Sequence, residues 1–409
     1  MAHAKSYDVV VIGGGAAGIS TAASMLKRRG DLSLVIVDPS SNHYYQPGWT
    51  MVGSGVFEPQ VTRRAMADVI PGGAQWIQKA AATFQPELNQ VTLDDGTILH
   101  YKILIAAPGI RLAWEQIEGL EETLGRNGVT SNYRYDLAPY TWELVRNLKS
   151  GRAIFSQPPM PIKCAGAPQK AMYLSCNEWE DRGVLGNITV EFCNAGGVLF
   201  GVDAYVPALM EYVERYGIDL RLGSKLVSVD GDKKIATFET ADGVYHREFD
   251  MLHVVPPQVA PQFIADSPLA AESGFVDVDQ ATLQHTRYPN IFGLGDAGSM
   301  PNAKTAAAAR KQAPLVAVNA LAVLAGREPC CEYDGYGSCP LTVERGKIVL
   351  AEFGYGGKLL PSFPTWLIDG TRPARLSWIL KTEILPWVYW NGMLKGHEWM
   401  VKPKENRSA

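Results

Sequence analysis

The sequence predicts an α/β fold made of two strand–helix–strand domains in tandem, followed by a C-terminal region of short amphipathic segments. A glycine-rich turn at residues 13–18 separates an apolar run from a helical pattern near the N-terminus. A second alternation of strand and helical patterns begins at Gly151, and five of the ten tryptophans lie beyond residue 365. These observations predict two tandem Rossmann-like dinucleotide-binding domains with a C-terminal amphipathic membrane-contact region.

The composition is that of a folded protein with several large cores. The chain has 409 residues, of which 46% are hydrophobic and 20% charged. A formal net charge of −4 gives no electrostatic reason to expect nucleic acid as a partner. The six cysteines are too few for a disulfide scaffold, and the seven histidines form no metal-ligand pattern, so no metal site is predicted.

The cellular location is predicted from what the sequence lacks. Only Met1 to Ser6 precede the first apolar run, which leaves no room for a signal or transit peptide. No stretch reaches the roughly 18 to 20 apolar residues of a spanning helix. We therefore expect folding in the cytoplasm and a peripheral or monotopic contact with a bacterial inner membrane, on a face that the sequence does not specify.

The first domain begins with a dinucleotide-binding fingerprint. A strand is expected over Tyr7 to Ile12, a helix over Ala16 to Arg29 and a second strand over Leu32 to Val37, which Asp38 ends. Glycines let the turn approach a pyrophosphate, the helix N-terminus offers N–H donors, and Asp38 accepts hydrogen bonds from ribose hydroxyls. The turn contributes five predicted cofactor contacts: Gly13, Gly15, Ala16, Ala17 and Gly18.

Two later segments resemble the two-dinucleotide-domain flavoproteins. Leu104 to Gly109 reads as a strand ending in Pro-Gly, and Ile291 to Asp296 as a strand ending in Gly-Asp, with a helix from about Ala303. In that family the Gly-Asp carboxylate holds the FAD ribityl chain and the next helix points at the flavin ring. The resemblance implies FAD as the cofactor, with contacts from Gly109, Gly295, Asp296, Lys304, Thr305 and Ala306.

The second domain lacks the corresponding fingerprint for a nicotinamide cofactor. Its strands are expected over Ala153 to Ser156 and Ile188 to Phe192, with a helix over about Pro168 to Asp181. The loop over Gln157 to Gly166 contains three prolines, which remove N–H donors where a pyrophosphate would bind. We therefore expect electrons to enter through sulfur, at Cys164 of this loop, and not from NADH.

Cys164 lies a few residues before a helix, beside Lys163 and close in sequence to Lys170. A helix N-terminus and an ammonium group both lower the pKa of a thiol from its ordinary value of about 8.5, and so favour the thiolate. Taken alone, Cys164 can also be a small buried apolar residue and Lys170 a solvated one. The cysteines expected to be only structural are Cys176, Cys193, Cys330 and Cys331.

Four segments resemble the sulfide:quinone oxidoreductases. Lys163 to Lys170 resembles their active loop, and Tyr336 to Pro340 resembles the segment of their second redox cysteine, here Cys339. The other two are His43 to Trp49, which adds Gln46 to the expected FAD contacts, and Leu385 to Asn391, which is typical of an animal-like branch. We therefore expect a flavoprotein that oxidises hydrogen sulfide.

The resemblance also implies the order of events. Hydrosulfide opens a Cys164–Cys339 disulfide or its sulfur-bridged form, a persulfide remains on Cys339, and two electrons pass through FAD to ubiquinone or another membrane quinone. Lys170 is the candidate for supporting the thiolates. Residues 124–136 lack the third cysteine of many bacterial members, which favours a small sulfane-sulfur acceptor such as glutathione, sulfite or coenzyme A.

The C-terminal tryptophans are interleaved with basic residues, among them Lys381 and Lys395. This mixture is typical of a segment lying in the plane of a lipid surface, although a helical hairpin or a contact in a homo-oligomer stays open. We expect Pro386 to split the segment into two short helices, and Phe353 and Tyr389 to lie near the quinone ring.

The expected domains are an FAD-binding domain (1–115 and 281–328), a second Rossmann-like domain without an NAD site (116–280), and a C-terminal region (329–409). Three other functions stay open. A type-two NADH:quinone dehydrogenase would need the missing glycine loop. A sulfide dehydrogenase flavoprotein subunit donating to a cytochrome would normally be exported, and a flavin redox sensor would not turn over.

Overall fold

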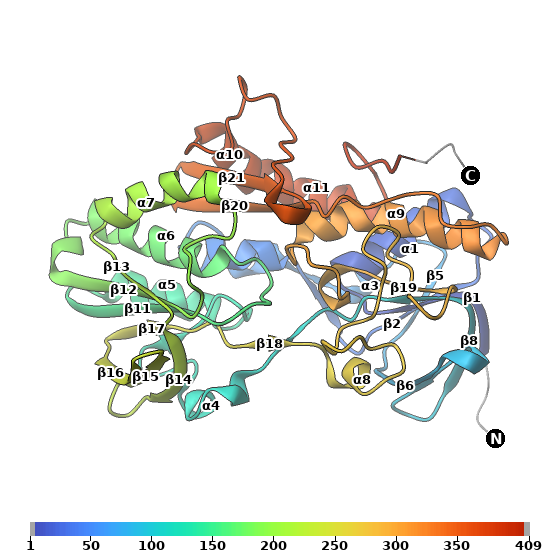
Figure 1. Ribbon diagram of the computed structural model, residues 1–409, viewed down its shortest axis with the longest axis horizontal. Helices are drawn as coiled ribbons and strands as arrows, with labels where there is room; N and C mark the ends of the chain where they lie inside the picture. The colour runs from blue at the N-terminus through green and yellow to red at the C-terminus, as the bar shows by residue number, and fades with distance from the viewer. Residues whose placement is uncertain (1–4, 405–409) are drawn as a thin grey trace.

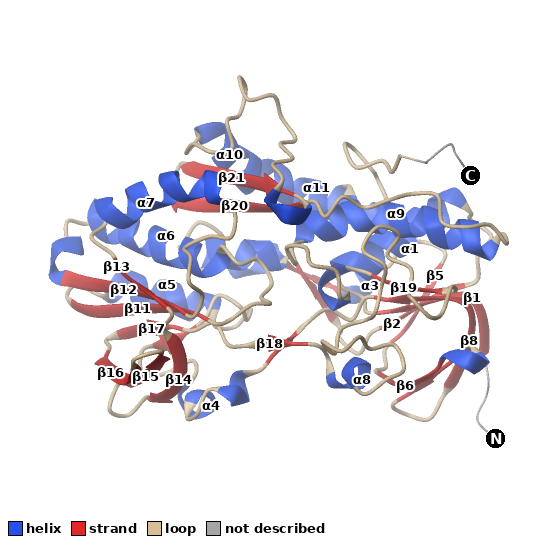
Figure 2. Ribbon diagram, in the orientation of Figure 1, coloured by secondary structure: helices blue, strands red, loops and turns tan. Residues whose placement is uncertain are grey.

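Two sheets lie end to end along the long axis of the molecule, and helices cover them (Figures 1 and 2). The computed structural model describes residues 5–404, so the expectation about a targeting segment at Met1 to Ser6 falls largely outside the described residues. The predicted α/β class is confirmed, with Rossmann-like sheets in both halves. The exact domain limits stay a prediction.

The first sheet has seven strands in the order β5-β2-β1-β8-β7-β6, and β19 pairs with β8. The central strands β1, β2, β5, β8 and β19 run parallel, whereas β6 and β7 return antiparallel at one edge. Because β19 comes from the last third of the chain, this sheet joins segments from both halves of the sequence. Its strands are β1 (Lys5–Ile12), β2 (Leu34–Val37), β5 (Ala74–Ile77), β6 (Ala81–Gln85), β7 (Gln90–Leu93), β8 (Ile98–Ala106) and β19 (Ile291–Gly293).

Burial explains the uninterrupted apolar runs of this sheet. Residues 9–12 of β1 are 0–2% exposed, as expected for a parallel strand covered on both faces. Helices α1 (Ala16–Arg28) and α9 (Ala306–Leu324) pack against each other over one face of the sheet (Figure 1). Helix α1 follows β1 and α9 follows β19. Because these two strands run in the same direction, both helices begin at the same edge of the sheet, where the glycine-rich turn lies.

The second sheet is parallel, in the order β10-β17-β11-β12-β13. A three-stranded antiparallel sheet, β14-β15-β16, packs beneath it (Figure 1). The strands are β10 (Val129–Thr130), β11 (Gly151–Gln157), β12 (Ile188–Asn194), β13 (Asp219–Leu222), β14 (Lys225–Asp230), β15 (Ile235–Thr240), β16 (Gly243–Glu248) and β17 (Met251–His253). The helices beside it are α5 (Ala138–Asn147), α6 (Ala167–Asp181) and α7 (Val206–Arg215).

A hairpin from the C-terminal region lies on the second half of the molecule. Its strands are β20 (Gly337–Glu344) and β21 (Lys347–Phe353), and β20 packs against α6. Shorter elements join the layers: β3 (Asn42–Tyr44), β4 (Arg63–Ala65), β9 (Arg111–Leu112), β18 (Gln258–Val259), α2 (Trp49–Val52), α3 (Met66–Val69), α4 (Leu120–Thr123) and α8 (Gln262–Ala265).

The C-terminal helical segment is continuous where a break at Pro386 is expected. Helix α10 (Arg375–Ile379) passes through a π-helical turn (Leu380–Ile384) into α11 (Leu385–Asn391). Proline is tolerated in the first turn of a helix, and the wider π turn before it accommodates its missing N–H. The expected split at Pro386 is therefore wrong. In the part of the chain that the structure describes, no helix is long and apolar enough to span a bilayer.

We expect Gly18→Ala to lower the FAD content of the purified protein sharply. A Cβ at residue 18 would lie 1.9 Å from the Gly13 carbonyl oxygen, so the turn cannot keep its shape, at a cost of about 1–3 kcal/mol. The measurement is the ratio of flavin to protein absorbance. Gly186→Ala, where a Cβ meets no atom within 4 Å, is the matched control. A full flavin content in Gly18→Ala would contradict the expectation.

Candidate active site

The structure brings Cys164 and Cys339 together from positions 175 residues apart, with 3.4 Å between their Sγ atoms. Cys164 lies in the loop between β11 and α6, and Cys339 lies on β20. Two S–S bonds of about 2.05 Å at a near-tetrahedral angle would place their outer sulfurs about 3.3 Å apart. The observed separation therefore suits a single bridging sulfur atom, and a small movement suits a direct disulfide.

The backbone of Cys164 is held in the left-handed region, with φ +51°, which is uncommon for a residue other than glycine. Its N–H donates to the Lys304 carbonyl oxygen at 2.8 Å, and the Tyr133 hydroxyl donates to its carbonyl oxygen at 3.3 Å. These bonds connect the sulfur-bearing loop to the segment before α9. They fix where the thiol points.

The ammonium of Lys170 donates to Cys164 Sγ at 3.0 Å from the first turns of α6. Its side chain is buried, so the reading of Lys170 as a solvated residue is wrong. Burial disfavours the ammonium, but the two cysteine sulfurs raise the pKa of Lys170 above its usual value. A buried ammonium in this position needs an anionic partner.

The two thiols have opposite electrostatic environments. The hydrogen bond from Cys339 and the charges of Lys170 and Lys381 hold the pKa of Cys164 well below its usual range. The hydrogen bond to Cys164, burial and the charge on Cys164 raise the pKa of Cys339. Cys164 is therefore the thiolate of the reduced pair, and Cys339 is the thiol that donates to it.

Gly166 is required for the approach of the two cysteines, and the sequence reasoning missed it. A Cβ at this residue would lie 2.6 Å from Cys339 Sγ and 2.3 Å from Leu341 Cδ2. The start of α6 can therefore pack directly on β20 only with glycine here. Its place between Cys164 and the predicted helix start was the feature of the sequence that could have indicated it.

A cavity of about 1020 Å³ runs from the glycine-rich turn to Cys164. Its size suits a dinucleotide with a substrate beside it, because ordinary ligand pockets reach about 1,000 Å³. Gly18 lies outside the lining and packs beneath the turn against Gly13. All other expected FAD contacts line the cavity: Gly13, Gly15, Ala16, Ala17, Asp38, Gln46, Gly109, Gly295, Asp296, Lys304, Thr305 and Ala306.

Polar groups of the lining fit a polar cofactor. The Asp296 carboxylate lines the cavity and makes no hydrogen bond to the described residues, and burial raises its pKa. Buried polar groups are normally paired, so this carboxylate is available to the hydroxyl groups of a ligand. The residues present therefore fit FAD.

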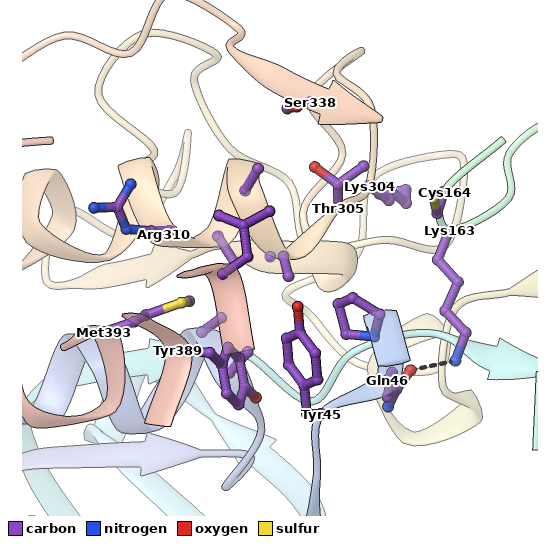
Figure 3. A pocket seen from close by; sticks show the side chains of 18 of the residues that line it. Tyr45, Gln46, Lys163, Cys164, Lys304, Thr305, Arg310, Ser338, Tyr389 and Met393 are labelled. Atoms are coloured by element: carbon purple, nitrogen blue, oxygen red, sulfur yellow. Dashed lines mark hydrogen bonds between the residues drawn. The ribbon is translucent and has the colours of Figure 1, made fainter. Parts of the chain in front are cut away.

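Lysines surround the end of the cavity near the cysteines (Figure 3). Lys163 Nζ donates to Gln46 Oε1 at 2.8 Å, and burial lowers the pKa of Lys163. Lys304 Nζ donates to the carbonyl oxygens of Asp296 and Gly298 at 2.9 and 2.7 Å, and burial lowers its pKa to about 8. These ammonium groups make this end of the cavity attractive to anions.

The C-terminal helices close the cavity from the other side. Tyr389, which was expected near the quinone ring, lines it, and its hydroxyl donates to His43 Nε2 at 2.7 Å. Burial lowers the pKa of His43 to about 4, so His43 is neutral and its Nδ1–H donates to the Gly14 carbonyl oxygen at 2.9 Å. The glycine-rich turn is thereby hydrogen-bonded to α11 through one histidine.

Two C-terminal residues lie elsewhere than expected. Phe353 packs against Phe200, with ring centroids 5.9 Å apart, and is not part of the cavity lining. Lys381, expected among the lipid-facing residues, is buried and donates to the Pro47 carbonyl oxygen at 2.9 Å. Burial and the charge of Lys170 lower the pKa of Lys381 to about 7.

The other cysteines lie outside the lining of the cavity. Cys176 and Cys193 are fully buried, as predicted, and burial raises the pKa of Cys176. The backbone N–H groups of Cys330 and Cys331 both donate to Asn319 Oδ1, so this pair closes the end of α9. No cluster of metal-ligating side chains occurs within residues 5–404.

Comparison with known proteins identifies the family. The family described as pyridine nucleotide-disulphide oxidoreductase matches residues 7–158. The chain is 41% identical over 399 residues to the mitochondrial sulfide:quinone oxidoreductase of Dictyostelium discoideum, and the match covers 96% of this chain and 87% of that one. This chain belongs to the sulfide:quinone oxidoreductases.

Further comparisons agree with the family and with the fold. The mitochondrial sulfide:quinone oxidoreductase of Mus musculus is 40% identical over 394 residues, with 96% of this chain and 87% of the relative covered. The X-ray structure of the enzyme from Aquifex aeolicus superposes with a TM-score of 0.79 at 20% identity, over 95% of this chain and 92% of that one. The oxidoreductase thus binds FAD, oxidises sulfide and reduces a quinone.

The family decides between the functions that the sequence left open. The NADH dehydrogenase, cytochrome-linked and non-enzymatic alternatives are set aside because the full-length relatives are sulfide:quinone oxidoreductases. Both relatives are mitochondrial proteins. The expectation of a bacterial inner membrane therefore receives no support.

We expect Lys170→Met to shift the pH dependence of Cys164 alkylation upward by about one pH unit or more. Removing the ammonium destabilises the thiolate and raises the pKa of Cys164, so less thiolate is present at mildly acidic pH. The measurement is the rate of iodoacetamide labelling of Cys164 in the reduced protein, followed by mass spectrometry. Lys170→Arg keeps the charge and should retain most of the reactivity. An unchanged pH profile in Lys170→Met would show that Lys170 does not stabilise the thiolate.

Proposed function

We propose that Cys164 and Cys339 form the redox pair of this sulfide:quinone oxidoreductase and that Cys339 carries the sulfane sulfur. The observation that carries the proposal is the 3.4 Å between the two Sγ atoms, with the Lys170 ammonium 3.0 Å from Cys164 Sγ. A pair at this distance can be bonded directly or through one sulfur atom. A buried cation beside it supports the charged, reduced form.

The electrostatics favour attack of hydrosulfide on the sulfur of Cys339. In thiol exchange the thiol with the lower pKa leaves faster, and the pKa of Cys164 is the one that is lowered. The S–S bond breaks, Cys164 leaves as a thiolate beside Lys170, and Cys339 keeps the added sulfur as a persulfide. Bound FAD supplies a two-electron acceptor that can in turn reduce a quinone. An acceptor nucleophile takes the sulfane sulfur from the persulfide and leaves Cys339 as a thiolate. The Cys164 thiolate, which lines the cavity, and the Cys339 thiolate then give up two electrons as the bond between their sulfurs re-forms.

A small anionic thiol or sulfite is the acceptor that the site supports for the sulfane sulfur. Lys163, Lys170 and Lys304 line the same end of the cavity, and they would attract an anionic nucleophile. Glutathione, sulfite and coenzyme A have this chemistry. Residues 124–136 contain no third cysteine that would hold a growing sulfur chain.

A lipid surface is the partner that the C-terminal region supports. Exposed apolar side chains gather after residue 358, in the loop before α10, along α10 and α11, and in the segment after α11. The loop before α10 and helix α10 lie in the upper part of Figure 1. Trp and Leu side chains exposed in this way are typical of one-sided membrane contact. The residues are Leu359, Trp366, Leu367, Leu376, Ile379, Ile384, Trp387, Trp399 and Met400.

The position of Tyr389 supports entry of the quinone from the same side. The cavity lining near α11 continues through Leu359, Phe363 and Met400, of which Leu359 and Met400 belong to the exposed apolar set. A lipid-soluble quinone could thus pass from the bilayer to the cavity along apolar side chains. The hydroxyl of Tyr389 and the ammonium of Lys381 are the polar groups available where it would arrive.

We expect Cys164→Ser and Cys339→Ser each to slow sulfide-driven bleaching of the flavin absorbance by on the order of 1000-fold or more. Serine keeps the shape but cannot form the S–S bond. The measurement is an anaerobic stopped-flow spectrum after sulfide addition, with decylubiquinone added last to restore the absorbance. Cys330→Ser, a partly exposed cysteine outside the cavity, should react like the unaltered protein. Rapid bleaching in either active-site variant, or bleaching by NADH, would contradict the proposal.

We expect Trp366→Ser combined with Trp387→Ser to weaken binding to phosphatidylcholine vesicles by about 10-fold or more, because two large apolar side chains leave the contact. Trp366 is 83% and Trp387 56% exposed, so folding should not suffer. The measurement is co-sedimentation with vesicles. Val244→Ser, at a residue 61% exposed on β16, is the control. Equal binding by all three proteins would place the lipid contact elsewhere.

A further inference from the structure

A second cavity, of about 430 Å³, lies between α1, the segment from Arg64 to Gly72, and the end of the C-terminal helices. It is separate from the flavin and sulfur site, since the two cavities share no lining residue. Neither the oxidation of sulfide nor the reduction of quinone requires it. Its lining combines side chains of two kinds, basic and apolar.

Three basic residues line this cavity: Lys27, Arg64 and Lys395. All three are exposed, and no carboxylate in the part of the chain that the structure describes lies within 4.0 Å of their charged nitrogens. Asp68 is the one acidic residue of the lining. The cavity is therefore electropositive on a protein whose formal net charge is −4, which points to an anionic ligand.

The basic groups are positioned by their neighbours. The guanidinium of Arg64 lies over the indole ring of Trp390, with 4.3 Å to the ring centroid, a cation–π contact that fixes its plane. Lys27 Nζ donates to His397 Nδ1 at 3.1 Å, so His397 accepts with a neutral ring. Both cations keep further N–H donors for a ligand.

The lining also includes apolar side chains. They are Leu26, Val69, Pro71 and Leu394, together with the largely buried ring of Trp390. A free phosphate ion gains nothing from these side chains. A ligand with a phosphate group and attached hydrocarbon would satisfy both kinds of side chain together.

A row of stacked rings connects this cavity to the exposed apolar surface of the C-terminal region. The ring of His397 stacks on Trp399 at 5.0 Å, and Trp399 stacks on Trp387 at 5.7 Å. Trp387 and Trp399 are 56% and 45% exposed. The basic rim and the predicted lipid contact are therefore one continuous surface.

We propose that this cavity binds the phosphodiester headgroup of an anionic phospholipid, with Lys27, Arg64 and Lys395 on the phosphate and the acyl chains along Trp399 and Trp387. The inference rests on the membrane contact proposed above. It adds a preference among lipids that apolar contact alone cannot give, because hydrocarbon chains are alike in neutral and anionic lipids.

The test compares vesicles of phosphatidylcholine alone with vesicles that also contain phosphatidylglycerol. We expect the unaltered protein to bind the anionic vesicles more tightly, and Lys27→Gln combined with Lys395→Gln to lose on the order of 25-fold, about 5-fold for each charge near a lipid surface. Binding to phosphatidylcholine alone should not change. Arg146→Gln combined with Lys149→Gln, two exposed cations at the end of α5, is the charge-matched control.

A second variant separates a shaped site from diffuse attraction. Gly72→Phe adds a ring at the cavity wall, where a Cβ meets no atom within 4 Å, and changes no charge. We expect it to weaken binding to the anionic vesicles alone, with Gly186→Phe as the control. Flavin content and the midpoint of thermal unfolding report whether each variant is folded.

The outcomes are distinguishable. Equal binding to both kinds of vesicle, or equal losses in the Lys27/Lys395 and Arg146/Lys149 variants, would overturn the headgroup site and leave the membrane contact intact. Failure to bind any vesicle would overturn both. Full competition by inorganic phosphate, compared with chloride at the same ionic strength, would assign the site to free phosphate and overturn the lipid assignment.

Discussion

The candidate active site depends on one interaction, the pairing of a buried ammonium with a sulfur anion. Lys170 is 2% exposed, and a charge so far from water is destabilising unless an opposite charge lies beside it. Cys164 supplies that charge at 3.0 Å. The need is mutual, because the same ammonium lowers the pKa of Cys164. Helix α6 provides the lysine, and the loop before it provides the cysteine, so one short segment, residues 164–170, holds both partners. Strand β20 brings the second sulfur to this pair, and the absence of a side chain at Gly166 lets it come close.

Much of the cofactor cradle could be predicted because it depends on local backbone chemistry. The glycine-rich turn, Asp38 and the Gly-Asp turn at Asp296 occupy fixed places in strand–helix patterns, and all three line the cavity. Cys164 was predicted from its loop before a helix, whereas Cys339 and the pairing of the two cysteines came from a family resemblance, since nothing in the local sequence indicates that β20 packs against α6. From the sequence, Lys170 could either support the thiolates or be a solvated residue, and only its burial between the helix and the hairpin decides between these interpretations.

The remainder depends on contacts between distant segments, which sequence patterns do not reveal. Asn132 and Thr50 line the cavity, yet neither stands in a recognisable motif. Phe353 was expected near the quinone, but it is the neighbouring Glu352 and Leu350 that line the cavity. Pro386 was expected to interrupt a helix, whereas a π-helical turn absorbs its effect. That turn also directs Lys381 inward, which reverses the expectation for this residue.

The hydrogen bond between His43 and Tyr389 has a consequence for how the protein is made. His43 joins the glycine-rich turn to a helix that lies 346 residues later, so the cradle at the start of the chain has no far wall until its end has left the ribosome. Nascent chains fold their N-terminal parts first, and here the first half waits with an incomplete pocket. The wall of the cofactor cavity and the apolar C-terminal surface are therefore completed by the same late segment of the chain. A chain that terminates early would lack both the lipid contact and a wall of its cofactor site.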